Sequence, residues 1–294
     1  MNLRLAPSEV SSFRGVQWQN IRSLGRGGVA NVFLMQQVPD QENDAGLPEF
    51  LALKIPKNVK PSEYRGPVED LMARRDALPP NVQSFLVPYY GVNDDGAWMD
   101  FCRGAPEKWI LKPNARSSLD EITFFLSDFK GRLRAVLGAL KVLEEAQICH
   151  GDLKPANIAW TYPNAPILLD LDGLALFNTD FYKYFSTWIF RPPELAGHIL
   201  PAVSCSGTDP YSLMMALGCH LNLIAKEPTP DHRKIPLIFV LRDELISRAW
   251  CVDNHEAASV FAATLAELIG GFTQYDPKNR MRLDEGLALL DSGL

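Results

Sequence analysis

Residues 150–158 read HGDLKPANI, and this stretch decides how the rest of the chain is interpreted. Asp152, Lys154 and Asn157 place an acid, a base and an amide within a few positions of each other. The proline among them argues against a helix interior, and so many polar groups argue against a buried strand. We therefore interpret this stretch as a loop that holds side chains for chemistry.

The sequence on both sides of this loop predicts mainly helix. Before it, apolar residues recur at the spacing of one helix face, namely Phe129, Leu133, Val136, Leu137, Leu140 and Leu143. After it, PILLDLDGLAL holds two short apolar segments around acids, and from about residue 209 the pattern is mostly helical.

The first third of the chain predicts strands instead. Apolar and β-branched runs separated by turn residues are typical of strands, and they occur at 17–24, 30–38, 50–55, 84–92 and 97–102. A short helix is expected at 67–78, because it begins with proline followed by acid. RGAPEKW at 103–109 is rich in turn formers and is interpreted as a hinge. The sequence thus predicts an α+β fold with a strand-rich lobe followed by a helix-rich lobe.

Composition limits the classes of function. The 294 residues are 47% hydrophobic and carry a net charge of −6, which lacks the basic footprint of a nucleic-acid binder. Five cysteines are scattered without a CxxC pair, which indicates free thiols in a reducing compartment and hence a cytoplasmic protein. No apolar run of about 18 residues occurs, so no membrane span is expected.

A glycine-rich stretch, LGRGGVANVF at 24–33, lies between two predicted strands. Gly25, Gly27 and Gly28 let the backbone approach a ligand, and exposed amides there suit phosphate. The alternative is a plain hairpin turn. A dinucleotide fingerprint would need a helix after the glycines, whereas a strand is predicted here.

Lys54 lies in an otherwise apolar predicted strand, LALKIP. Such a lysine often points to water, but a buried one needs a countercharge. Glu69, near the start of the predicted short helix, is the expected partner, and Glu63 is the rival.

The 150–158 stretch resembles the catalytic loop of eukaryotic-type protein kinases, whose pattern is H-R-D-x-x-x-x-N. The resemblance implies that Asp152 is the catalytic base and that Asn157 is a metal ligand. It also implies that Lys154 steadies the transferred phosphate. His150 is expected to pack and hydrogen-bond rather than transfer protons.

Further motifs of this family match in order over about residues 20–290. The matching positions are Gly25, Gly27 and Val32 of the glycine-rich loop, Ala52 and Lys54 of the third strand, Glu69 of the helix and Met99 as gatekeeper. In the second half they are Asp170 as metal ligand, Thr187 and Glu194 before the next helix, Asp209 as anchor, and Arg280 as partner of Glu194.

The resemblance implies a bilobal Ser/Thr protein kinase that uses ATP and magnesium. It assigns 1–19 to an extension, 20–103 to the first lobe and 104–294 to the second. ATP is expected near Asp100 to Cys102, with adenine between Val32, Ala52 and Ala159. The protein substrate is not identified by the sequence.

Two departures from the family pattern bear on function. Gly151 replaces the arginine that normally meets phosphate on the activation loop, which predicts activity without phosphorylation there. DLD stands where DFG is usual, so Asp172 rivals Asp170 as the metal ligand. The acidic variant also keeps open a kinase of a small molecule or glycolipid. A pseudokinase scaffold is the third alternative, disfavoured by the intact set of Lys54, Asp152, Asn157 and Asp170.

Overall fold

The computed structural model describes residues 9–39, 46–102, 119–161, 165–177, 190–196, 207–220 and 256–292. The chain separates into two compact units, Met1–Arg103 and Gly104–Leu294. Thr187 and the predicted hinge at 103–109 lie outside the described residues. The fold is a mixture of an antiparallel sheet and several helices, which is compatible with a kinase-like fold.

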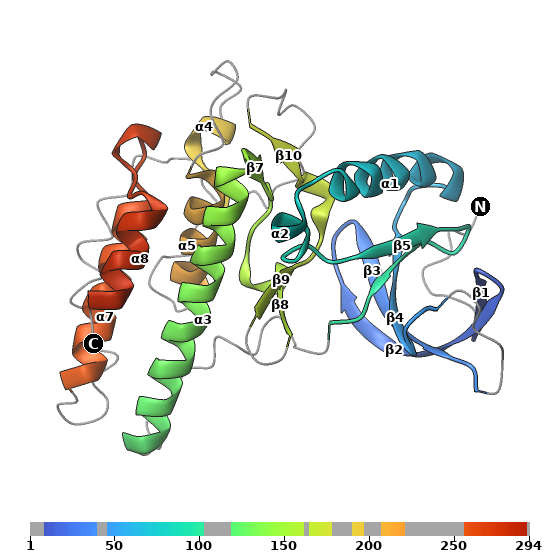
Figure 1. Cartoon of the computed structure of the whole chain (residues 1–294), viewed down its shortest axis with the longest axis horizontal. Helices are drawn as coiled ribbons and strands as arrows, with labels where there is room; N and C mark the ends of the chain where they lie inside the picture. Colours follow the sequence, from blue (N-terminus) through green and yellow to red (C-terminus); the bar gives the residue numbers. More distant parts are fainter. Residues whose placement is uncertain are drawn as a thin grey trace. The chain divides into compact units, whose positions relative to one another are not determined.

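Six antiparallel strands form the sheet of the first unit, in the order β1-β2-β3-β4-β6-β5 (Figure 1). They are β1 (Val10–Phe13), β2 (Val16–Arg26), β3 (Ala30–Gln37), β4 (Phe50–Pro56), β5 (Tyr89–Val92) and β6 (Ala97–Asp100). The runs predicted at 17–24, 30–38 and 50–55 are confirmed as strands, and the first four residues of the run at 97–102 form β6. Only the last four residues of the predicted strand at 84–92 form β5.

One face of this sheet forms a hydrophobic core. The buried side chains come from alternate positions, as a half-buried sheet requires, and include Phe13, Trp18, Phe33, Met35, Leu51, Leu53 and Trp98. Phe13 stacks on Trp98 with ring centroids 4.8 Å apart. This aromatic contact joins β1 to β6, which are far apart in the strand order.

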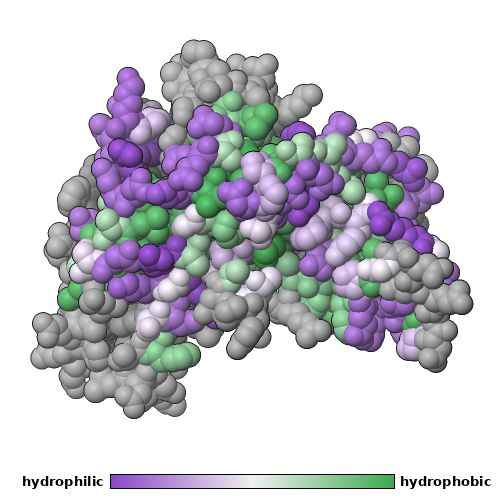
Figure 2. Space-filling model, in the orientation of Figure 1, coloured by the Kyte–Doolittle hydropathy of each residue, from purple (hydrophilic) through white to green (hydrophobic). Residues whose placement is uncertain are grey.

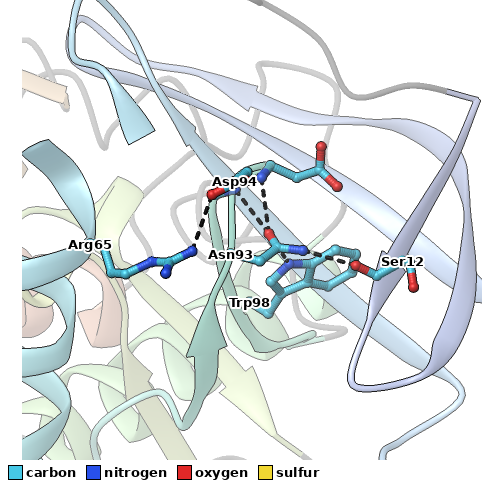
Figure 3. Close-up of polar contacts among 7 residues, drawn as sticks. Ser12, Arg65, Asn93, Asp94 and Trp98 are labelled. Atoms are coloured by element: carbon cyan, nitrogen blue, oxygen red, sulfur yellow. Dashed lines mark hydrogen bonds and ion pairs between the residues drawn. The ribbon is translucent and has the colours of Figure 1, made fainter. Parts of the chain in front are cut away.

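The two edges of the sheet are joined by side-chain hydrogen bonds around Asn93 (Figure 3). Its amide nitrogen donates to the carbonyl of Ser12 over 2.9 Å, and its side-chain oxygen accepts from the Trp98 indole over 2.9 Å. Arg14 also donates to the carbonyl of Tyr90. The sheet is therefore curled so that β1 lies beside the end of β5.

Residues 1–19 are predicted from the sequence as an extension, but β1 and the first residues of β2 lie in this range. Arg14 and Gly15 form a two-residue turn between these strands, both with positive φ, of 51° and 80°. Such turns match the twist of paired strands. Residues 10–19 are therefore an integral part of the sheet.

Two helices follow β4, α1 (Pro61–Asp76) and α2 (Pro80–Gln83). α1 begins six residues before the predicted start, because Pro61 occupies its first turn and Pro67, taken as the start, lies inside it. Val68, Leu71 and Arg75 form its buried face. Exposed charged residues of α1 include Glu69, Asp70 and Arg74, and Figure 2 shows a hydrophilic surface over this helix.

Helices dominate the described part of the second unit. They are α3 (Leu119–Glu145), α4 (Pro193–Ala196), α5 (Thr208–His220), α7 (Glu256–Phe272) and α8 (Leu283–Ser292). α3 contacts α5, α7 and α8 (Figure 1). All six residues of the apolar face predicted for α3 are at most 2% exposed, so that prediction is confirmed. Among the described residues, no helix is long and apolar enough to cross a membrane.

Short strand pairs and turns follow α3 and carry the polar loop. β7 (Ile148–Cys149) pairs with β10 (Ala175–Leu176), and β8 (Ile158–Thr161) pairs with β9 (Ala165–Leu168). The described part of this unit also contains the short 3₁₀ turns η2 (Pro155–Asn157), η3 (Leu171–Gly173) and η7 (Pro277–Asn279). The stretch 150–158 thus runs from β7 to β8 as the predicted loop.

Candidate active site

Strand register gathers five predicted nucleotide-binding residues on one face of the first unit's sheet. Val32 lies opposite both Gly25 and Lys54, and Ala52 lies opposite Met99. Ala52 and Lys54 are two residues apart, so they share a face. Lys54 is only 4% exposed. On this face the buried Lys54 side chain lies among small and apolar side chains. The aromatic core is on the opposite face of the sheet.

Glu69 lies on α1 with its side chain exposed. Its expected ion pair with Lys54 is not among the contacts of the described residues, and that role stays a prediction. Glu63, the rival, is in the first turn of the same helix, where its carboxylate accepts from the Lys60 amide over 3.4 Å. Glu63 therefore serves as part of the helix cap.

Asp100 and Cys102 lie at the end of β6, where the sequence predicts contact with the nucleotide base. Burial raises the pKa of the Asp100 carboxyl, although the Phe101 amide donates to it over 3.1 Å. Burial, together with the charge of Asp100, raises the pKa of the Cys102 thiol to about 12. Cys102 is therefore a protonated, free thiol at neutral pH.

In the second unit, Asp209 in the first turn of α5 anchors the polar loop. Its two carboxylate oxygens accept from the amides of His150 over 2.6 Å and Gly151 over 2.9 Å. Burial raises the pKa of this carboxyl, while the two amide bonds act in the opposite direction. The anchoring role predicted for Asp209 is confirmed by these bonds.

Asp152, Lys154 and Asn157 are brought together in the loop. Lys154 Nζ lies 2.8 Å from Asp152 Oδ2, and both side chains are partly buried. Asn157 Nδ2 donates to the backbone carbonyl of Asp152 over 2.9 Å. Because Asn157 is the last residue of η2, two positions after Pro155, the short turn brings its side chain back towards Asp152. Asn157 Nδ2 also donates to Asp152 Oδ2 over 3.4 Å, so both Lys154 and Asn157 contact the carboxylate.

His150 is fully buried and acts as a structural connector, as predicted. Its Nε2 lies 2.7 Å from the carbonyl of Leu169, which can only accept, so Nε2 donates. Its Nδ1 accepts from the Asp152 amide over 3.3 Å. The ring thus links the loop to the residue just before Asp170.

Asp170 and Asp172 lie at the start of η3. Asp170 has φ 57° and ψ 61°, a left-handed conformation that aspartate tolerates better than most residues. In an extended segment the two acids would share a face, but the residues after Asp170 form a 3₁₀ turn, which has three residues per turn. Asp172 is exposed, whereas Asp170 is half-buried.

The donor set of Asn157 and Asp170 fits magnesium. Mg²⁺ takes oxygen ligands and is commonly held by one or two carboxylates with substrate phosphates and water. Since Asn157 Nδ2 donates to Asp152, its side-chain oxygen is the atom left for a cation. Within the described part of the chain, no group of three or more His, Cys, Asp or Glu forms a metal site. Asn157 and Asp170 therefore suit a magnesium ion whose other ligands are phosphate oxygens and water.

Arg280 and Glu194 form the predicted pair. Two parallel bonds of 2.6 Å join the guanidinium to the carboxylate, and both side chains are 2% exposed. Arg280 also lies over the ring of Tyr211, 4.6 Å from its centroid. Such bidentate geometry gives a buried pair both strength and direction, so it fixes α4 beside the end of η7.

Sequence reasoning missed two features of the candidate residues, one in each unit. A Cβ added to Gly151 would lie 2.5 Å from the Gly173 carbonyl oxygen, so the two backbones meet without room for a side chain. Lys57 donates through Nζ to the Gly27 carbonyl over 2.6 Å. Glycine at both 151 and 173 was the available signal for the first feature. The contact between Lys57 and Gly27 could not be predicted from sequence spacing, because thirty residues separate the two partners.

The chain is similar to curated protein kinases. It is 24% identical over 266 residues to a probable serine/threonine-protein kinase of Dictyostelium discoideum, an alignment covering 88% of this chain and 52% of the relative. It is 36% identical over 86 residues to the probable serine/threonine-protein kinase yakA of the same organism, covering 29% of this chain and 5% of the relative. No protein-family model matches the chain.

The chain thus spans about half the length of the first of these relatives and a small part of the second. The weak similarity covers most of this chain and supports membership of the protein kinase superfamily.

Proposed function

We propose that this chain is an ATP- and magnesium-dependent protein kinase that transfers the γ-phosphate of ATP to serine or threonine hydroxyls. The observation that carries the proposal is the arrangement of Asp152, with Lys154 Nζ 2.8 Å from its carboxylate and Asn157 on its backbone carbonyl. Asp209 holds this loop through the two preceding amides.

Phosphoryl transfer depends on positioning and charge neutralisation more than on covalent chemistry by the protein. In the proposed mechanism Asp152 orients the acceptor hydroxyl and accepts its proton. Lys154, already beside Asp152, steadies the transferred phosphate. The loop amides around Gly27 and the Lys54 ammonium hold the phosphates of ATP.

Asn157 and Asp170 would hold magnesium, which supplies charge neutralisation at the phosphate oxygens. Val32, Ala52 and Ala159 would contact the adenine, with Met99 at the back of the slot and Asp100 and Cys102 at its edge. Val32 and Ala52 are on the face of the sheet that also carries Lys54, which supports one nucleotide site for all three.

The buried Arg280–Glu194 pair supports a protein acceptor, because the corresponding pair is a feature of the protein kinases that the sequence resembles. The second acid of DLD favours the alternative, a kinase of a small molecule or glycolipid. We give the protein acceptor preference, since the bidentate pair is a built structural feature whereas Asp172 is an exposed side chain.

An acceptor panel tests this proposal. The chain is incubated with γ-labelled ATP and magnesium together with a generic basic protein, a mixture of small hydroxyl compounds or glycolipid vesicles. Label in phosphoserine or phosphothreonine of the protein is the expected result. Label only in the small compounds or lipid would favour the alternative acceptor. ATP binding without any transfer would favour a pseudokinase.

A further inference from the structure

Lys57 makes two contacts with the turn between β2 and β3, although it lies just beyond β4. Its side-chain ammonium donates to the Gly27 carbonyl over 2.6 Å. Its backbone amide donates to the Val29 carbonyl over 2.7 Å. One residue therefore holds two alternate carbonyls of the glycine-rich turn.

The turn itself is tight. The Gly27 amide donates to the Ala30 carbonyl over 2.9 Å, and a Cβ on Gly27 would lie 3.2 Å from that same oxygen. The Gly27 carbonyl accepts from Lys57. The orientation of the peptide between Gly27 and Gly28 therefore depends on a side chain outside the turn.

Holding the Gly27 carbonyl also sets the direction of the next amide. A trans peptide is planar, so its C=O and N–H point in opposite directions. With the Gly27 oxygen directed at Lys57, the Gly28 N–H is directed away from Lys57. Within the described part of the first unit, the amides of Gly28 and Val29 have no hydrogen-bond acceptor. These two amides can therefore donate hydrogen bonds to an anion, as successive turn amides commonly do.

We propose that Lys57 is a positioning residue for the nucleotide phosphates, which holds the Gly27–Gly28 peptide so that the Gly28 amide is presented to them. The inference rests on the proposed kinase function and deepens it. Lys57 acts through the turn and does not touch the nucleotide. It is distinct from Lys54, which lies on the sheet face three residues earlier and is buried.

The test compares ligands with and without phosphates. Binding of ATP with magnesium and of adenosine is titrated by calorimetry with the whole chain, Lys57→Met, Lys57→Arg and Lys60→Met. Lys57→Met keeps an apolar stem and removes the donor, and Lys57→Arg keeps the charge and a donor. Lys60→Met is the charge-matched control, because Lys60 is a nearby exposed lysine. Thermal unfolding checks that each variant is folded, and Lys57→Gln replaces the Met variant if it is not.

A positioning role predicts that Lys57→Met weakens ATP binding about tenfold, the order expected for one hydrogen bond to a charged group. Adenosine binding should stay within about twofold of wild type, and Lys57→Arg should recover most of the ATP affinity. An equal loss for both ligands, no loss, or the same loss in Lys60→Met would overturn the inference. If the wild-type chain binds neither ligand, the proposed function itself fails, and this inference fails with it.

Discussion

The backbones of Gly151 and Gly173 are in direct contact, with room for no side chain on either. A Cβ on Gly151 would lie 2.5 Å from the Gly173 carbonyl oxygen, and a Cβ on Gly173 would lie 2.8 Å from the His150 carbonyl oxygen. This contact joins the loop that carries Asp152 to the turn that begins at Asp170. The glycine in HGD is thus required by its surroundings and is not simply a lost arginine.

Gly151→Arg is therefore expected to damage the protein instead of restoring a more usual kinase loop. The new side chain would need a left-handed backbone at φ 83° and would collide with Gly173. We expect the free energy of unfolding to fall by roughly 2–4 kcal/mol, as the sum of backbone strain and overpacking. Urea unfolding monitored by fluorescence measures this change.

Alanine substitutions at Gly15 and Gly151 separate the cost of backbone strain from the cost of the contact with Gly173. Gly15 has φ 80°, but a Cβ there meets nothing within 4 Å. Gly15→Ala should therefore cost only the backbone strain, about 1 kcal/mol, while Gly151→Ala should cost clearly more. Equal losses at the two positions would show that the contact with Gly173 is unimportant.

The sequence allowed prediction of those parts of the fold that depend on local patterns. The face of α3 was readable because Leu133, Leu137 and Leu140 recur at helical spacing over a long segment. The strands β2 to β4 were readable because long apolar runs flank turn residues. The loop at 150–158 was readable because its polar residues fit neither element.

β1 could not be found in the same way. In this strand the polar Ser11 is buried with Phe13, while the apolar Val10 is exposed. The sequence therefore lacks the alternation of apolar and polar residues that marks a strand. The Arg14–Gly15 turn was the remaining signal. The start of α1 was predicted six residues too late, because Pro67 was taken as the first residue of the helix. Pro67 in fact lies inside α1. Contacts between backbone segments far apart in the sequence, as between Gly151 and Gly173, produce no periodic pattern from which they could be predicted.

The two acids of DLD are expected to differ in function. Asp170 stands thirteen residues after Asn157, as the family's metal ligand does, and is half-buried, whereas Asp172 is exposed in the following turn. Asp170→Asn should abolish phosphoryl transfer and raise the magnesium concentration needed for ATP binding. Asp172→Asn should retain measurable turnover. Magnesium titrations of both variants check this, and the reverse pattern would show that the metal site is placed two residues away.

Cys102 should be unusually slow to react with alkylating reagents. Its pKa is raised to about 12 by burial and by the charge of Asp100, and only the thiolate is nucleophilic. At pH 8 the thiol is almost wholly protonated in the folded protein, and its reactivity should rise with pH up to about 12. Against the same residue in urea, we expect alkylation by iodoacetamide to be roughly 10³-fold slower.

Peptide mapping by mass spectrometry assigns that reaction to Cys102 and separates it from the other four cysteines. Asp100→Asn removes the second cause of the shift and should make Cys102 modestly more reactive. Modification of Cys102 in the folded protein as fast as in urea would contradict the burial of this thiol.

The central claim is that Asp152 serves phosphoryl transfer, and Asp152→Asn tests it most directly. The substitution keeps the shape of the side chain but removes the charge that faces Lys154. Asp94→Asn is the control, because that carboxylate is 92% exposed and pairs with Arg65 at the surface of the first unit. Initial rates of γ-phosphate transfer to a basic protein are measured for both, together with ATP affinity. We predict that Asp152→Asn lowers the rate by about 10²–10⁴-fold with ATP affinity little changed, while Asp94→Asn matches wild type. Near-normal turnover in the Asp152→Asn variant would contradict the account.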